Sequence, residues 1–218
     1  AVSEAAALHQ VDGLCTMATN LAPRTVAEVS TRLGLNGISA TSAFNATDKA
    51  TMRRLCHLAG VPIVAGEVTS DGEAALELCE RLGFPVIFKP SDSSGCRGIR
   101  VVSDKSGVNG AFEFAKANSL SGEVVLEKFH GEALVFGVES LIHEGETSVI
   151  SISDKMFRWS HASVLQGSPY PPHSLLMNRH KCVRLCTKFM ALWGLIQGHH
   201  TSILYGLTVH HESSMPVL

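Results

Sequence analysis

The sequence predicts a mixed fold of helices and strands, of the α/β or the α+β class. Segments with strand character alternate with segments of helical spacing along most of the chain. Hydrophobic residues make up 45% of the 218 residues and charged residues 17%, a balance typical of globular proteins. The length suffices for one sizeable core or for two small lobes that share a cleft.

The first part of the chain is expected to begin with a strand and to continue as helices. Residues 11–16 predict a buried strand, and a helix over Pro23–Leu33 should end at Gly34. A second helix should begin near Thr47-Asp48, because apolar residues then recur at helical spacing until Gly60 and Pro62 stop it.

The next helix carries its own start and stop signals. Ser70 and Glu73 have the spacing of a capping box, in which each side chain satisfies the other residue's backbone amide. This helix should run to Leu82 and stop at Gly83. The further elements predicted, in order, are a strand Pro85–Lys89, a loop Pro90–Gly98, a strand Ile99–Val102, a helix opened by Ser103 or Asp104 and carrying Phe112, Phe114 and Ala115, a strand Val124–Glu127, paired strands Gly137–Ile142 and Ser148–Ile152, a helix Asn178–Trp193, and strands His200–Leu204 and Leu207–His210 joined at Tyr205-Gly206.

Charge and hydropathy exclude several classes of function. The net charge is −2, with 18 basic and 20 acidic residues, and there is no polybasic run, so we expect no nucleic-acid partner. No apolar stretch is long enough to span a bilayer, and the N-terminus lacks the features of a signal peptide, so we expect no membrane partner and a cytoplasmic protein. The first residue is Ala1 and not Met, so it need not be the natural start.

The six cysteines and the histidine pairs give no convincing metal or disulfide pattern. Without a secretion signal, reduced and mostly buried thiols are favoured over disulfides. Cys182 and Cys186 lie four apart on a predicted helix, but no further ligands follow at zinc spacing. His199-His200 and His210-His211 could bind a transition metal from paired strands, although half-buried or solvated histidines are the favoured interpretation.

The stretch from Phe88 to Ile99 is the most informative for chemistry. Lys89 ends a buried strand, and a loop of small residues with two glycines leads into the next strand. Small residues let backbone amides approach an anion closely, and Lys89 adds a positive charge suited to phosphate. The alternative is an ordinary hairpin with a solvated lysine. The stretch is neither a Walker loop nor a dinucleotide-binding fingerprint.

The order of motifs resembles the ATP-grasp superfamily. Asp48-Lys49 opens a helix, Gly83 to Pro90 leads into the loop Ser93–Gly98, and Val124 to Phe129 follows. The resemblance covers about residues 36–142 well, and it is nearest to the L-amino-acid (dipeptide) ligases and the ATP-binding domains of carbamoyl-phosphate-synthase type. It implies an α+β ATP-grasp fold, in which two α+β subdomains clasp ATP.

The same resemblance implies roles for individual residues. Lys49 and Lys89 match two lysines that contact the ATP phosphates, and Glu127, Lys128 and Phe129 match a hinge whose backbone reads the adenine edge. Glu132 is a candidate for the ribose, and Lys155 is a candidate catalytic residue facing substrate or phosphate, with a solvated strand end as the alternative. The flexible flap over the β- and γ-phosphates corresponds to Ser93, Ser94, Gly95, Cys96, Arg97 and Gly98.

The metal site departs from the family pattern. ATP and Mg²⁺ are the expected ligands, but Ser202 stands where the first magnesium carboxylate is expected, and the second would come beyond Leu218. We therefore assign no metal ligand. The predicted domains are the end of a preATP-grasp α/β domain over residues 1–40 and an ATP-grasp domain over residues 41–218, each truncated at its outer end.

Three functions remain open from the sequence. The first is an ATP-dependent carboxylate–amine ligase that works through an acyl-phosphate on a small carboxylate or amino acid. The second is a catalytically inactive nucleotide-binding paralogue or fragment, which the serine at Ser202 favours. The third is a carboxylase, carbamoyl-phosphate-synthase or purine-pathway enzyme of the same superfamily. Whether the chain is an enzyme is left open, residues 1–218 alone are expected to be inactive, and a homodimer is one expected assembly.

Overall fold

The computed structural model describes residues 1–16, 19, 21–131, 134–143, 146–154, 156–159, 163–167, 187–188 and 203–211. The chain divides into two compact units. Unit 1 comprises Ala1–Val61, Val138–Ser151 and Met177–Gly206, and unit 2 comprises Pro62–Gly137, Ile152–Leu176 and Leu207–Leu218. Among the described residues, no helix has both the length and the apolar character needed to cross a membrane.

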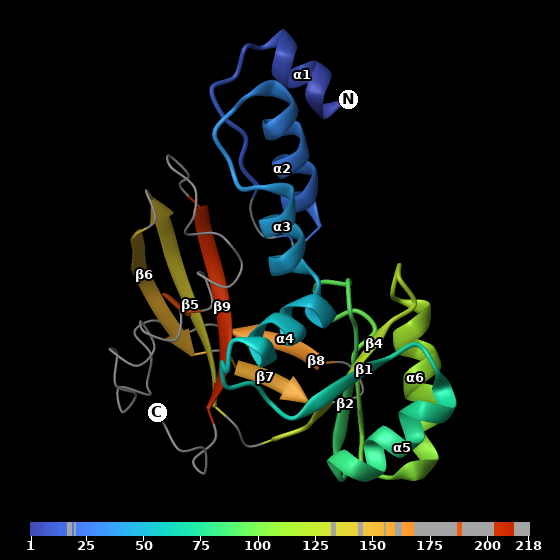
Figure 1. The fold of residues 1–218 in the computed structure, drawn as a ribbon. Helices are drawn as coiled ribbons and strands as arrows, with labels where there is room; N and C mark the ends of the chain where they lie inside the picture. Colours follow the sequence, from blue (N-terminus) through green and yellow to red (C-terminus); the bar gives the residue numbers. More distant parts are fainter. Residues whose placement is uncertain are drawn as a thin grey trace. The chain divides into compact units, whose positions relative to one another are not determined.

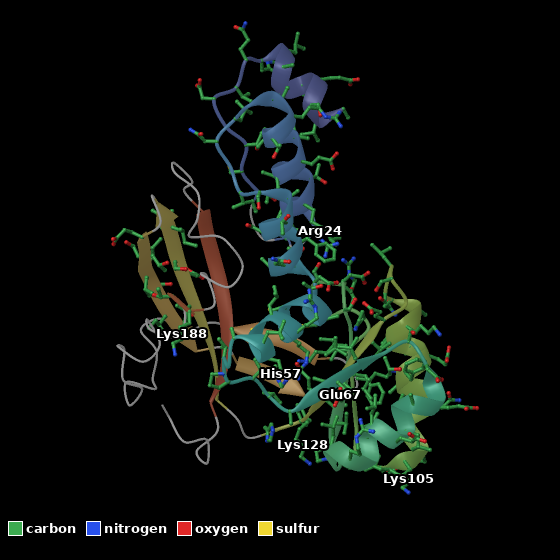
Figure 2. The ribbon with its side chains drawn as sticks, in the orientation of Figure 1. Arg24, His57, Glu67, Lys105, Lys128 and Lys188 are labelled. Carbon is green, nitrogen blue, oxygen red and sulfur yellow. The ribbon has the colours of Figure 1, made fainter. Side chains whose placement is uncertain are left out.

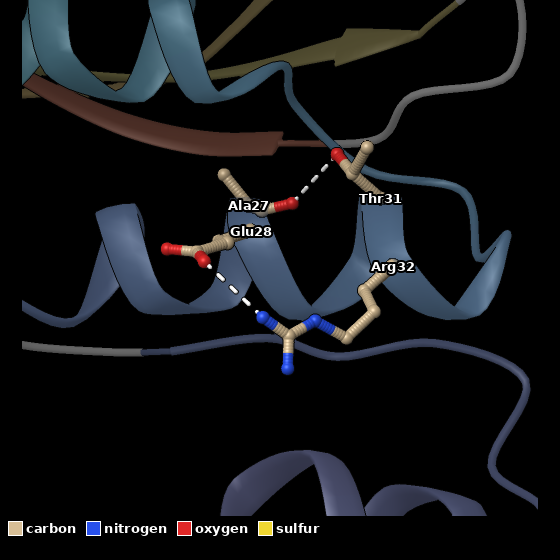
Figure 3. A network of polar contacts seen from close by, with 4 residues as sticks. All are labelled: Ala27, Glu28, Thr31 and Arg32. Carbon is tan, nitrogen blue, oxygen red and sulfur yellow. Dashed lines mark hydrogen bonds and ion pairs between the residues drawn. The ribbon is translucent and has the colours of Figure 1, made fainter.

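Unit 1 begins with four helices: α1 (Val2–Leu8), α2 (Ala22–Leu33), α3 (Ala40–Thr47) and α4 (Lys49–Leu58). The predicted helix ending at Gly34 is confirmed as α2, and Gly34 closes it in the left-handed conformation with φ 67°. On its surface, the Thr31 hydroxyl donates to the Ala27 carbonyl at 2.9 Å, and Arg32 lies 3.5 Å from Glu28 (Figure 3).

The helix expected near Thr47-Asp48 is confirmed as α4, and α3, which was not predicted, precedes it directly. The buried Asp48 separates the two helices: it follows α3, and its carboxylate accepts a hydrogen bond from the Thr51 N–H at 2.8 Å as the N-cap of α4. Arg24 of α2 connects to α3, because its Nε donates to the Thr47 hydroxyl at 2.7 Å and its guanidinium lies 4.4 Å from the centre of the Phe44 ring.

The predicted buried strand over residues 11–16 is wrong. Only one isolated bridge forms there, between Gly13 and Asn36, and none of residues 11–16 is buried. Asp12 and Gly13 interrupt the apolar run, and both residue types are unfavourable in strands.

Unit 2 contains a four-stranded sheet of β1 (Gly66–Thr69), β2 (Val86–Pro90), β3 (Arg100–Val102) and β4 (Val124–Lys128). The strand order is β1-β4-β2-β3, and all neighbours are antiparallel. Helices α5 (Gly72–Leu82) and α6 (Val108–Ala117) pack on one face (Figure 1). Their shared core consists of Ala75, Leu78, Cys79, Val86, Phe88, Val102, Val108, Ala111, Phe112, Ala115, Val124 and Leu126.

The helix caps in unit 2 follow the expected chemistry with one shift. The predicted capping residue Ser70 is wrong by one position: Asp71 is the N-cap of α5, and its carboxylate accepts from the Glu73 N–H at 2.9 Å. A carboxylate at this position is also stabilised by the helix dipole. Asp104 caps a short 3₁₀ turn, Lys105–Gly107, that leads into α6.

Two further sheets involve the later part of the chain. Strands β5 (Leu134–His143), β6 (Glu146–Asp154) and β9 (Ile203–His211) form a sheet of order β6-β5-β9, which confirms the predicted β5–β6 pairing. Strands β7 (Met156–Trp159) and β8 (Ser163–Gly167) form an antiparallel hairpin.

Of the last predicted elements, one is wrong and another lies mostly outside the described residues. The predicted turn at Tyr205-Gly206 is wrong, because β9 passes through both residues without a break. An aromatic residue favours a strand, and a single glycine is tolerated within one. The predicted helix Asn178–Trp193 lies outside the described residues, except for Thr187 and Lys188, which are helical.

Candidate functional site

The two faces of the β1–β4 sheet differ sharply in composition. The register pairs Phe88 with Leu126 on the face covered by α5 and α6. Because successive side chains alternate between faces, the opposite face carries the residues between them. In β2 and β4 these are Ile87, Lys89, Val125 and Glu127. This opposite face therefore offers two buried aliphatic side chains and two charges side by side.

Lys89 and Glu127 form an ion pair on that face. Their side chains are 17% and 16% exposed, so the pair is largely shielded from water. Shielding strengthens the attraction between the charges, and it also makes each charge costly to leave alone. Lys89 is thus held in place by a carboxylate, on a face whose aliphatic side chains in β2 and β4 are buried.

Lys128, labelled in Figure 2, alternates with Glu127 along β4 and so lies on the face covered by α5 and α6, where its side chain has a structural role. Its ammonium donates to the carbonyls of Gly83 at 2.9 Å and Phe84 at 2.8 Å, which fixes the turn after α5. The Lys128 N–H donates to the Ala65 carbonyl, and the Phe129 N–H donates to the Pro85 carbonyl. A purine edge would have to be read by backbone groups other than these two N–H donors.

The loop between β2 and β3 forms a tight turn at its tip. Gly95 and Cys96 both have positive φ, 66° and 60°, and the Arg97 N–H donates to the Ser94 carbonyl at 3.4 Å. Positive φ at both central residues is the mark of a type I′ turn. A cysteine rarely adopts this conformation, so Cys96 is a local backbone outlier of the kind that clusters at functional sites.

Both ends of this loop are fixed to the turn that precedes β4. Ser91 is fully buried and its N–H donates to the Glu123 carbonyl at 3.1 Å. At the other end, a Cβ at Gly98 would come within 2.5 Å of the Pro90 side chain and 2.6 Å of the Asn118 side chain. Only glycine fits there, and its φ of 75° gives a second reason.

Asp92 adds a third anchor that the sequence did not reveal. Its carboxylate accepts hydrogen bonds from the N–H groups of Leu120 and Ser121 and from the Ser119 hydroxyl. Burial pushes the pKa of Asp92 upward, but hydrogen bonds from the Leu120 and Ser121 backbones and from nearby serine hydroxyls outweigh it and hold the pKa below its ordinary value. The available sequence signal was an aspartate next to small polar residues, a common turn pattern.

The other predicted site residues belong to unit 1 or lie outside the described residues. Lys49 is the first residue of α4 in unit 1, where it is partly buried. Glu132, Lys155 and Ser202 lie outside the described residues. Their roles, like those of Ser93–Gly98 and the hinge, stay predictions.

The described part of the chain contains no group of three His, Cys, Asp or Glu side chains that could hold a metal ion. The carboxylate of Glu139 on β5 accepts a hydrogen bond from the Ser151 hydroxyl on β6 at 2.9 Å. Single carboxylates of this kind do not make a magnesium site, which needs several oxygen ligands.

Comparison with known proteins identifies the fold around this site. Residues 48–147 match the family described as the carbamoyl-phosphate synthase L chain, ATP binding domain, a range that includes β1–β4, the loop and the ion pair. The chain has the ATP-grasp fold, and residues 48–147 resemble this ATP-binding domain. The predicted α+β ATP-grasp fold is therefore confirmed.

Individual relatives agree with this assignment. The carbamoyl phosphate synthase large chain of Thermus thermophilus is 28% identical over 159 residues, which is 72% of this chain and 16% of that one. The biotin carboxylase domain of Hydrogenobacter thermophilus 2-oxoglutarate carboxylase, solved with MgADP and bicarbonate, has a TM-score of 0.77 at 21% identity and covers 95% of this chain. An L-amino acid ligase from Bacillus licheniformis has a TM-score of 0.72 at 19% identity and covers 97% of this chain.

The chain spans only part of the solved proteins it resembles. It spans 47% of the solved biotin carboxylase domain and 48% of the solved L-amino acid ligase. Sequence identity to both is low, so the structural likeness carries the fold and not the substrates.

Proposed function

We propose that this chain is the ATP-binding part of a carboxylate–amine ligase that works through an acyl-phosphate. The observation that carries the proposal is the placement of Lys89. It is the last residue but one of β2, on the sheet face away from α5 and α6, and the Ser93–Gly98 loop begins four residues later. The match to an ATP-binding family covers this whole region.

Two features of this site could hold ATP: the charge of Lys89 and the backbone amides of the loop tip. Lys89 offers an ammonium to the phosphates, and Glu127 orients that ammonium from the neighbouring strand. Ile87 and Val125, on the same face, are 4% and 1% exposed, so they shield the ion pair from water and leave no open apolar surface for a base. The turn at Gly95-Cys96 brings small residues and backbone amides to the loop tip, where phosphate oxygens can be approached closely.

The reaction that fits this arrangement has two steps. A carboxylate oxygen attacks the γ-phosphorus of ATP, the bond to the bridging oxygen breaks, and ADP leaves. An amine nitrogen then attacks the acyl carbon, inorganic phosphate leaves with the bonding electrons, and the nitrogen releases a proton to the phosphate or to water. Because the first step brings two anions together, the protein's contribution is to position them and to offset their repulsion.

Magnesium would neutralise charge on the phosphates in such a reaction. The described residues do not fit that ion, because they contain no cluster of carboxylates. We therefore derive no step through a metal. The MgADP in the biotin carboxylase domain is a property of that protein.

Trapping the intermediate tests the proposal. The chain is incubated with ATP, magnesium and hydroxylamine, with either a pool of amino acids or bicarbonate as the acceptor. Hydroxamates and ADP that form only with amino acids support the ligase. ADP formation that depends on bicarbonate supports a carboxylase or carbamoyl-phosphate type of reaction instead.

A second candidate is a nucleotide-binding paralogue without catalysis. The serine at Ser202, where a magnesium carboxylate is expected, favours it. This candidate predicts saturable ATP binding in a titration. In the trapping assay it predicts no formation of ADP that depends on an acceptor. Absence of any ATP binding would contradict both candidates.

A further inference from the structure

We infer that Asp92 is a positioning residue, which holds the Ser93–Gly98 loop where it can act on the phosphates of ATP. This inference rests on the proposed function. Asp92 is the second residue after β2 ends, so it stands at the entrance to the loop.

The hydrogen bonds of Asp92 use both carboxylate oxygens. Oδ1 accepts from the Leu120 N–H at 3.0 Å and from the Ser119 hydroxyl at 3.0 Å, and Oδ2 accepts from the Ser121 N–H at 2.8 Å. These donors belong to one turn, between α6 and β4. Hydrogen bonds to an ionised acceptor are about twice as strong as neutral ones, so this turn is a firm support.

Neighbouring contacts join the same two segments. The Ser91 and Ser121 hydroxyls lie 3.0 Å apart, and Gly98, at the far end of the loop, is packed between Pro90 and Asn118. Thus one end of the loop is hydrogen-bonded to residues 118–123 and the other end packs against them. The five residues between Asp92 and Gly98 connect these two fixed ends. Moving the anchor would move the turn at Gly95-Cys96 with it.

The charge of Asp92 needs these donors for a second reason. An aspartate beside a loop that receives phosphate would repel the ligand if its charge were uncompensated. Three hydrogen-bond donors face the carboxylate here and offset that charge locally. The pKa of Asp92 is held below its usual value, so the carboxylate stays ionised at neutral pH and keeps accepting all three bonds.

Two substitutions separate positioning from folding. Asp92→Ala removes every acceptor, whereas Asp92→Asn keeps one oxygen and places an amide donor opposite another N–H donor. The matched control is Asp104→Asn, because Asp104 also accepts hydrogen bonds from a local turn, through the Ser106 N–H and hydroxyl, but follows β3 at the end away from Gly98.

The readout is the affinity for ATP compared with AMP, measured by competition against a fluorescent ATP analogue. AMP keeps the adenosine and lacks the β- and γ-phosphates. We expect both Asp92 variants to weaken the affinity for ATP by about tenfold, which corresponds to about 1.4 kcal/mol. Their affinity for AMP should change by less than about twofold. Asp104→Asn should change neither.

Each other result has a definite meaning. Equal losses of affinity for ATP and for AMP would show that Asp92 only supports the fold of unit 2. Unchanged affinity for ATP would show that Asp92 does not position the loop. Either result overturns the inference. Wild-type chain that binds neither nucleotide contradicts the proposed function instead. In that case hydrogen exchange still tests the anchor. Faster exchange of the amides of residues 93–98 in Asp92→Asn than in Asp104→Asn supports the inference, and exchange at the same or a slower rate overturns it.

Discussion

Lys89 and Glu127 form an ion pair diagonally across two antiparallel strands. In the register, Lys89 stands opposite Val125 and Glu127 stands opposite Ile87, so the two charged residues are offset by two positions on the same face. Diagonal neighbours of this kind are within reach of long side chains. The arrangement presents the lysine on the face of the sheet where ATP is proposed to bind, and it keeps that cation compensated without a ligand.

A double-mutant cycle measures this pair. Lys89→Met and Glu127→Gln should each destabilise the chain by about 1–3 kcal/mol, below the range for fully buried pairs because both side chains retain some exposure. The double variant should lose less than the sum, with a coupling of about 1 kcal/mol in chemical unfolding. Additive losses would show that the two charges do not depend on each other.

Binding of ATP should depend on Lys89 and not on the exposed Lys105. Loss of one charged contact to a phosphate corresponds to about 1.5–3 kcal/mol, so Lys89→Ala should weaken ATP by at least about tenfold. The control is Lys105→Ala, since Lys105 is 67% exposed and pairs with Glu80 on the surface (Figure 2). Calorimetry that finds the same affinity for Lys89→Ala and wild type would remove Lys89 from the site.

The loop tip should exchange its amides quickly without nucleotide. Gly95 and Arg97 are exposed, and the hydrogen bond from the Arg97 N–H is long at 3.4 Å, whereas Phe88 and Leu126 lie in the sheet core. Hydrogen exchange should therefore separate the tip from β2 and β4, and ATP should slow exchange at the tip. Strong protection of Gly95 and Arg97 in the free protein would indicate a rigid structural turn.

Glycine substitutions in unit 2 should have opposite effects at two positions. Gly98→Ala forces a Cβ into the Pro90 and Asn118 side chains at a positive φ, and we expect a loss of about 1–3 kcal/mol in unfolding free energy. Gly110→Ala lies within helix α6 with nothing within 4 Å of the new Cβ, and it should stabilise by about 0.5–1 kcal/mol. Equal effects at both positions would contradict the packing described for Gly98.

Two buried thiols should make stability fall at alkaline pH. Burial raises the pKa of Cys56 and of Cys79 to about 11, from the ordinary value of 9.0, with Arg53 opposing the rise at Cys56. A raised pKa in the folded state stabilises the fold fully below pH 9, and that contribution is lost as the pH rises toward 11. The decline in unfolding free energy between pH 8 and 10.5 should be smaller in Cys79→Ala than in wild type; an identical decline would contradict the assigned burial of that thiol.

The sequence predicted the elements of unit 2 well, because strong local signals agree there with the packing. Gly83 after α5 and the apolar run before Lys89 define their boundaries without help from distant residues. The charge pair was not foreseen, since the register that brings Glu127 to Lys89 depends on pairing between strands 38 residues apart. Asp92 was missed for the same reason: its partners, Ser119 to Ser121, are distant in sequence and carry no motif of their own.

The most direct test of the central claim uses the cysteine already present in the loop. Cys96 is partly exposed and Cys15 is exposed, whereas Cys56 and Cys79 are buried, so a thiol reagent with peptide mass spectrometry can follow each separately. If Lys89 and the Ser93–Gly98 loop hold the phosphates, saturating ATP should slow the alkylation of Cys96 several-fold more than adenosine does, and leave Cys15 unchanged. Alkylation of Cys96 at the same rate with and without saturating ATP would contradict the account.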